Sequence, residues 1–147
     1  MFKIISENMN KIIKSKNSLD EDYKIWKESM QKEIQNEQKR WIIALHENII
    51  IGYFLYRVNN SELFLDEIQI KENYQGDKVT FIKLFSYLLN EELDDNVIVY
   101  AGINKKNKKS QGIVKKFGFI KYEETKQSFK YKTEWKSFKN ILNKHIL

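Results

Sequence analysis

A short polar turn with one glycine separates two apolar segments in the stretch KENYQGDKVTFIKLF, from Lys71 to Phe85. The run LFLDEIQI precedes this turn, and an amphipathic helix is predicted after it. A strand, a glycine turn and a helix can form an anion site, because the first N–H groups of a helix have no intrahelical partner and the helix dipole adds positive charge. Gly76 leaves two interpretations open: a phosphate-binding loop, or a plain turn whose helix is capped by Asp77.

The composition of the 147-residue chain excludes several kinds of site. There is no cysteine, which rules out disulfides, thiolate zinc sites and a cysteine nucleophile. Only His46 and His145 offer an imidazole, so we expect no metal site. No apolar run approaches the length of a membrane span, and the N-terminus lacks the apolar region of a signal peptide. We therefore expect a cytoplasmic protein that does not insert into a membrane.

The elements that would position this turn are predicted from apolar periodicity, and we expect one domain over residues 1–147. Three antiparallel strands with short polar turns are predicted in RWIIAL, IIIGYFLYRV and ELFLDEIQI. VIVYAGI is apolar throughout, as in a strand covered on both faces. FKIISE is predicted as a first strand, and one or two strands follow Phe119.

Helices are predicted from Leu19 to Lys39, after Gly76, between Asn107 and Gly118, and at the C-terminus. The first of them should pack an apolar face inward, formed by Tyr23, Trp26, Met30 and Ile34. This order of elements predicts an α/β fold with a mixed, mostly antiparallel sheet and helices on both faces.

The order of elements and two motifs resemble the GCN5-related N-acetyltransferases (GNAT), from about Trp41 to Trp135. The segment LFLDEIQIKENYQGDKVTFIKLFSYLL is similar to that family's strand, loop and helix for acetyl-coenzyme A. NKKSQGIVKKFGF looks like the family's asparagine-started helix that ends in Gly-Phe. The resemblance implies an enzyme that transfers an acetyl group from acetyl-coenzyme A, as co-substrate, to a primary amine of a small molecule or peptide, without a metal.

In the first motif, the family pattern is Gln or Arg, two residues, Gly, one residue, and Gly or Ala. Gln75 matches, whereas Lys78 stands at the first required glycine and Thr80 at the Gly or Ala position; Gly76 is a common extra. The resemblance implies that the backbone of Ile68, Gln69 and Ile70 pairs with the pantetheine arm. It also implies that the pyrophosphate is held by Gln75, Gly76, Asp77, Lys78, Val79 and Thr80. The Asp77 carboxylate would repel a pyrophosphate unless it points away.

In the second motif, Asn107 matches the asparagine that reaches the pantetheine arm, and Gly118 and Phe119 match the helix stop. Val114 stands where many members carry a tyrosine that protonates the departing thiolate. Because valine has no proton to give, Ser110 and Tyr100 are the candidates for the general acid, with water as the alternative.

The predicted general base is a carboxylate on the strand before the loop. Asp66 and Glu67 are adjacent, so on a regular strand they would face opposite sides and only one could serve. Asp66 would share its side with Phe64, Ile68 and Ile70, whereas Glu67 would share its side with Leu65 and Gln69. The resemblance favours Glu67; a surface carboxylate with no catalytic role, or a base acting through water, remains open.

Two other functions compete with this prediction. The departures at Lys78, Thr80 and Val114 favour a catalytically inactive module with the same fold that binds the coenzyme for regulation. Seven lysines and no acidic residue from Lys105 to Lys121 suggest a clamp for the coenzyme's 3′-phosphate or for RNA. We favour a solvated helix face, because nearly all basic residues are lysine in a chain also rich in Asn and Ile, and we expect no nucleic-acid partner. The segment QSFKYKTEW is a candidate for strand pairing in a homodimer.

Overall fold

The computed structural model describes residues 2–12, 19–59, 61–76 and 78–146, and the elements follow in the order ααβββαβαββα, with two short 3-10 helices. The N-terminal half contains α1 (Phe2–Ile12), α2 (Leu19–Ile34), β1 (Lys39–His46), β2 (Ile49–Val58) and β3 (Glu62–Ile70). The C-terminal half contains η1 (Glu72–Tyr74), α3 (Val79–Ser86), η2 (Tyr87–Asn90), β4 (Ile98–Asn104), α4 (Lys108–Lys116), β5 (Ile120–Glu124), β6 (Ser128–Glu134) and α5 (Trp135–Ile146).

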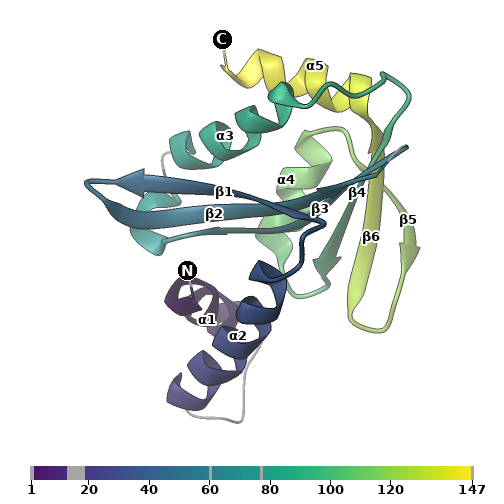
Figure 1. Cartoon of the computed structure of the whole chain (residues 1–147). Coiled ribbons are helices and arrows are strands. Elements are labelled where there is room, and N and C mark those ends of the chain that lie inside the picture. The colour runs from purple at the N-terminus through teal and green to yellow at the C-terminus, as the bar shows by residue number, and fades with distance from the viewer. Residues whose placement is uncertain (1, 13–18, 60, 77, 147) are drawn as a thin grey trace.

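The strands form one six-stranded sheet in the order β1-β2-β3-β4-β6-β5. Only β3 and β4 are parallel; the other neighbours are antiparallel. Figure 1 shows α3 and α5 on one side of the sheet and α1 and α2 on the other. The predicted mixed, mostly antiparallel sheet with helices on both faces is therefore confirmed.

Each face of the sheet carries its own apolar core. The larger core joins α3, α4 and α5 to one face, and its buried members include Phe54, Phe85, Phe117 and Phe138. The smaller core joins α1 and α2 to the opposite face through Ile5, Met30 and Tyr53. Alternation along β2 makes this possible, because successive side chains of a strand point to opposite faces.

The predicted N-terminal strand FKIISE is wrong, because residues Phe2–Ile12 form α1. Ile5 and Met9 are four residues apart, which places them on one face of a helix, and both pack in the smaller core. A six-residue segment with three apolar residues fits either period, so only its packing against Tyr53 decided between strand and helix.

Helix α2 is shorter and less buried than predicted. It ends at Ile34, and Lys39 already belongs to β1. Met30 is buried and Trp26 half-buried in the smaller core, but Tyr23 and Ile34 are exposed. Only part of the predicted apolar face therefore points inward.

Strand β4 is covered by helices on one face only, contrary to the prediction from its apolar sequence. Val99, Ala101 and Ile103 are buried in the larger core, whereas Tyr100 is half-buried and Gly102 exposed. The segment QSFKYKTEW forms β6 between β4 and β5. Since both its edges are hydrogen-bonded within the sheet, β6 is not open to pairing with a second copy, and the expected homodimer stays a prediction.

The two predicted ends of α4 are confirmed. The Asn107 side-chain oxygen accepts a hydrogen bond from the Ser110 backbone N–H at 3.1 Å, as an N-cap does. Gly118 adopts φ +82°, a left-handed conformation that suits a helix stop, and a Cβ there would lie 2.9 Å from Ile141 Cδ1. In the described part of the chain, no helix combines the length and apolar character that crossing a membrane requires.

Candidate active site

The centre of the sheet contains a gap between two neighbouring strands. Parallel pairing of β3 with β4 runs from Glu62 opposite Ile98 to Leu65 opposite Ala101 and stops there. β3 continues to Ile70 against β2, and β4 continues to Asn104 against β6. Beyond Leu65 the two strands therefore separate, and Ile68, Gln69 and Ile70 lie on the separated end of β3.

A β-bulge in β3 marks the point of separation. Leu55 of β2 lies opposite Glu67, but the next residue, Tyr56, lies opposite Leu65, so Asp66 is an extra residue in β3. A bulge of this kind shifts the alternation of the strand by one. Leu65, Ile68 and Ile70 consequently all face the larger core.

The bulge corrects the prediction that Asp66 and Glu67 face opposite sides. Glu67 bonds to Tyr53 of the smaller core, and Asp66 bonds to Lys39 and Arg57, which lie on that same side of β1 and β2. Both carboxylates thus lie on the face that α1 and α2 partly cover. A one-residue insertion, rather than the regular alternation of a strand, brings them together.

Both oxygens of Asp66 are bound by cationic side chains. Its Oδ2 atom lies 2.7 Å from both Lys39 Nζ and Arg57 Nε, and its Oδ1 atom lies 3.0 Å from Arg57 Nη2. Asp66 therefore anchors the bulge, and Glu67 is left as the candidate for proton transfer.

Glu67 is half-buried and accepts a hydrogen bond from the Tyr53 hydroxyl at 2.6 Å. Burial raises the pKa of the Glu67 carboxyl above its usual value, and hydrogen bonds from Tyr53 and Gln69 only partly offset this effect. Burial and the neighbouring carboxylate raise the pKa of Tyr53, so its phenol stays protonated and donates. A carboxyl with a raised pKa next to an open strand edge has the properties of a general base or acid.

The loop before α3 has the predicted order, but its left-handed residue is Lys78 rather than a glycine. Lys78 adopts φ +61° directly before Val79, the first residue of α3. This is the position of the glycine in the GNAT loop pattern, which explains why glycine suits it. Gly76 is not left-handed, and a Cβ added there would meet nothing within 4 Å, so its surroundings are open. Thr80 is buried in the first turn, and Asp77 lies outside the described residues.

The side chain of Gln75 ties this loop to its neighbours. Its Nε2 atom donates to the Ile70 carbonyl at 2.7 Å and to Asn8 Oδ1 at 3.4 Å, and its Oε1 atom accepts from Lys109 Nζ at 3.1 Å. The sequence motif singled out Gln75, but nothing in the sequence indicated Asn8 or Lys109 as its partners.

The two candidates for the general acid lie on opposite faces of the sheet. Tyr100 stacks on Phe64 with ring centroids 5.2 Å apart, on the face of Asp66 and Glu67. Ser110 is in the first turn of α4. Val114 of this helix packs against the larger core on the other face, and Phe117, directly after the helix, is buried in that core. Only Tyr100 shares a face with Glu67, so the structure does not bring all three predicted catalytic residues together.

Two contacts in or near the candidate site were missed by sequence reasoning. The Tyr53–Glu67 pair joins positions 14 apart on adjacent strands, and a tyrosine in an apolar strand carries no signal of such a partner. Gln111 is buried, and its Nε2 atom donates to the carbonyls of Asn104 at 3.2 Å and Lys105 at 2.9 Å. These bonds brace the turn between β4 and α4, on which Asn107 lies.

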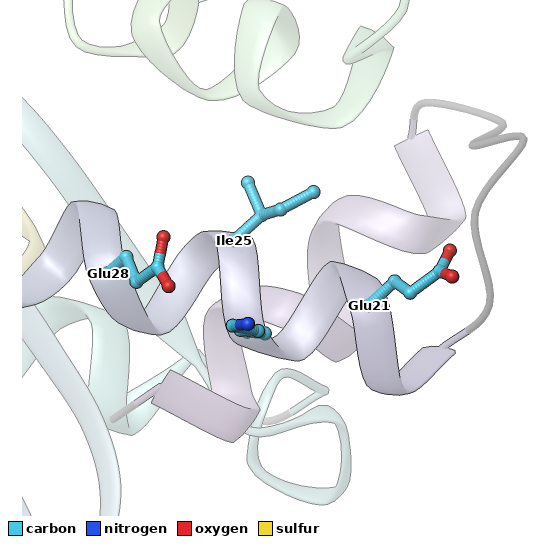
Figure 2. Close-up of a pocket in the computed structure, with 4 residues that line it drawn as sticks. Glu21, Ile25 and Glu28 are labelled. Atoms are coloured by element: carbon cyan, nitrogen blue, oxygen red, sulfur yellow. The ribbon is translucent and has the colours of Figure 1, made fainter.

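Two surface hollows lie outside this region. One, of about 400 Å³, is lined by Glu21, Lys24, Ile25 and Glu28 of α2, and Figure 2 shows Ile25 projecting from the helix between the two glutamates. The other, of about 200 Å³, is lined by Asn104, Lys105, Lys106, Lys126 and Gln127. Neither contains a predicted site residue. Among the residues that the structure describes, no group of three His, Asp or Glu side chains could hold a metal ion.

Comparison with known proteins identifies solved structures that have the same fold. No protein-family model and no curated protein matches the chain. The PaiA N-acetyltransferase of Thermoplasma acidophilum in complex with coenzyme A is 14% identical, with a TM-score of 0.72 over 91% of this chain and 90% of that chain. Campylobacter jejuni PseH N-acetyltransferase with acetyl-coenzyme A is 16% identical, with a TM-score of 0.57 over 91% and 95%.

A further solved structure, FdhC, described as a nucleotide-linked sugar GNAT, is 15% identical, with a TM-score of 0.64 over 99% of this chain and 86% of that chain. At these identities the likeness concerns the fold. The chain has the fold of the GNAT N-acetyltransferases, as the two motifs predicted.

Proposed function

We propose that this protein transfers an acetyl group from acetyl-coenzyme A to a primary amine of a small molecule or peptide. The observation that carries the proposal is the half-buried Glu67 carboxyl at the bulge of β3, where β3 and β4 separate. Solved structures of this fold are described in complex with coenzyme A and with acetyl-coenzyme A. That the acceptor is a primary amine also belongs to the proposal.

The described residues fit the coenzyme. β3 and β4 separate beyond Leu65, which leaves strand edges for the pantetheine arm, and the backbone of Ile68, Gln69 and Ile70 would line it. Gly76 is open to close approach by a pyrophosphate, together with the start of α3. Asn107 uses its side-chain oxygen to cap α4, which leaves its amide N–H groups to donate to a ligand. Acetyl-coenzyme A would supply the acetyl group as a thioester.

Glu67 would take the proton that the acceptor must lose. A primary amine is mostly an ammonium at neutral pH and becomes a nucleophile only as the free base. Burial raises the pKa of the Glu67 carboxyl, so its carboxylate accepts a proton more readily than an exposed one. A raised pKa also suits the role, because an ideal general base has a pKa near the working pH. The proton would move from the amine nitrogen to Glu67, directly or through one water, before nitrogen bonds to the acetyl carbon.

The departing thiolate needs little help from the protein. Val114 has no proton to donate and packs against the larger core. A free thiol has a pKa of about 8.5, so water can protonate the thiolate near neutral pH. Tyr100 remains the candidate on the Glu67 face, with a phenol whose pKa is raised by burial and by Glu62.

The competing proposal is a module that binds coenzyme A but does not catalyse. Lys78 at a glycine position and Val114 at a tyrosine position favour it. The two proposals agree on binding and differ only in turnover, so one assay separates them.

The test measures release of free thiol from acetyl-coenzyme A, with mass spectrometry of the acetylated product, across polyamines, amino sugars, amino acids and peptide N-termini. We expect turnover with at least one class, and Glu67→Gln should lower it more than tenfold. Glu92→Gln, a change of the same kind at an exposed residue, is the control. Binding of coenzyme A without turnover of any amine would favour the binding module, and no binding at all would contradict both proposals.

A further inference from the structure

Two side-chain amides interlock around one carbonyl at the end of β3. Asn8 Nδ2 in α1 donates to the Ile70 carbonyl at 3.0 Å and to Gln69 Oε1 at 2.8 Å. Gln75 Nε2 donates to the same carbonyl at 2.7 Å and to Asn8 Oδ1 at 3.4 Å. Both hydrogens of each amide nitrogen are used, so the orientation of each side chain is determined by its neighbours.

The network continues across the loop to α4. Lys109 Nζ can only donate, so the Gln75 oxygen must face it, and their separation is 3.1 Å. In the described part of the chain, no carboxylate forms an ion pair with Lys109. One chain of contacts thus joins α1, the end of β3, the loop before α3 and the first turn of α4. The last three of these are the walls of the candidate coenzyme site.

Asn8 also determines the orientation of the Gln69 side-chain amide. Because Gln69 Oε1 accepts from Asn8, its nitrogen is turned away from Asn8. Gln69 is also one of the groups that lower the pKa of Glu67 and so partly offset the effect of its burial. Asn8 therefore touches the partners of both halves of the site without touching Glu67 or the start of α3.

Packing of α1 does not need an asparagine at this position. Ile4 and Ile5 are buried, and Met9 packs in the smaller core, which supplies the apolar contacts of the helix. An amide that makes three hydrogen bonds to residues more than 60 positions away serves orientation rather than burial.

We propose that Asn8 is a positioning residue that holds Gln75 and Gln69, and through them the coenzyme loop and the base, in their working orientation. The hydrogen bonds of Asn8 do not depend on the proposed function, whereas their effect on coenzyme binding and catalysis rests on it. α1 then becomes part of the active site, although none of its side chains is expected to contact the coenzyme.

The test compares the wild-type protein with Asn8→Ala and Asn8→Asp. Coenzyme A is titrated by calorimetry, and hydrogen exchange is measured in the free protein at Gln75, Gly76 and the first turn of α3. We expect Asn8→Ala to raise the Kd for coenzyme A about tenfold and to speed exchange in the loop. Asn8→Asp should do more, because it places a carboxylate against two acceptor oxygens.

Two further variants separate positioning from stability. Glu7→Gln changes the neighbouring, exposed residue of α1 and should leave both the Kd and the exchange rates unchanged. Lys109→Met removes the ammonium group at the far end of the network. Because Lys109 is exposed, this change does not disturb the core, and it should raise the Kd by a smaller factor than Asn8→Ala does. Its effect should shrink when combined with Asn8→Ala, because the two residues act through Gln75.

The outcomes distinguish this inference from the proposed function. If the wild-type protein binds coenzyme A and both Asn8 variants match it in Kd and in loop exchange, the positioning role is wrong and the proposed function stands. If the wild-type protein binds no coenzyme A, the proposed function is wrong, and the exchange rates of the free protein alone decide whether Asn8 holds the loop.

Discussion

Replacing Tyr53 by phenylalanine should move the pH dependence of catalysis to higher pH. The Tyr53 hydroxyl donates to Glu67 Oε1 at 2.6 Å, and this bond favours the ionised carboxylate. Tyr53→Phe keeps the ring in the smaller core and removes only the donor. Loss of the hydroxyl also makes the surroundings of Glu67 less polar, which acts in the same direction, so the pKa of Glu67 should rise further.

The size of the shift follows from the strength of the bond. A hydrogen bond to a charged group contributes about 1.5–3 kcal/mol, and one pKa unit corresponds to about 1.4 kcal/mol. We therefore expect the pKa of Glu67 to rise by about one to two units in Tyr53→Phe. On the acid side of the profile kcat/KM should fall about 10- to 100-fold, and it should approach the wild-type value at high pH.

The chain offers a matched control on the opposite face of the sheet. The Tyr56 hydroxyl donates to Glu91 Oε1 at 2.7 Å, so Tyr56→Phe makes the same chemical change to a tyrosine–carboxylate pair that does not include Glu67. It should leave the acid limb of the profile in place. The carboxyl of Glu67 can also be titrated directly by carbon NMR, which requires no turnover. An acid limb and an NMR titration that both stay unmoved in Tyr53→Phe would refute the coupling between Tyr53 and Glu67.

Four other changes have defined outcomes. Because burial raises the pKa of Glu67 in the folded state, the native protein should lose stability as pH rises through that pKa. Glu67→Gln should therefore raise the thermal midpoint of unfolding at pH 8 and match the wild type at pH 4. A lower midpoint for Glu67→Gln at pH 8 would contradict the predicted direction of the stability change. Gly76→Val places its side chain in open space, so circular dichroism should be unchanged while the Kd for coenzyme A rises at least tenfold, or about 1.4 kcal/mol. Lys78→Gly relieves a left-handed backbone and should raise the free energy of unfolding in urea by about 0.5–1 kcal/mol; an equal gain from Lys78→Val would show that φ is not the cause. Changing Lys115 and Lys116 together to Gln should alter stability by less than about 0.5 kcal/mol and leave the preference for coenzyme A over its 3′-dephospho form intact, since both side chains are exposed.

Local patterns in the sequence were sufficient for most of the fold. Short polar turns between apolar runs predicted the hairpins of β1, β2 and β3, and these pair antiparallel as expected. Apolar positions three and four residues apart predicted α3, and Asn107 and Gly118 marked the two ends of α4. These features depend on interactions between residues close in the chain, which is why a single sequence can show them.

The candidate site depended on contacts between distant residues. Alternation along ELFLDEIQI predicted that Asp66 and Glu67 point apart, but the bulge in β3 turned both to one face, where Lys39 and Arg57 neutralise Asp66. Glu67 was predicted as the base from resemblance alone. Its partner Tyr53 and the burial that raises its pKa came only with the fold.

The first element shows the same division between local pattern and tertiary structure. FKIISE fits a strand or a helix by its own periodicity, and packing of Ile5 and Met9 beside Tyr53 made it α1. Only that choice brings Asn8 to Ile70 and Gln75. The sequence by itself determined most of the strands and helices and the position of the turn before α3. The tertiary structure decided which polar groups meet, because bulge register and helix docking place side chains that lie dozens of residues apart in the chain.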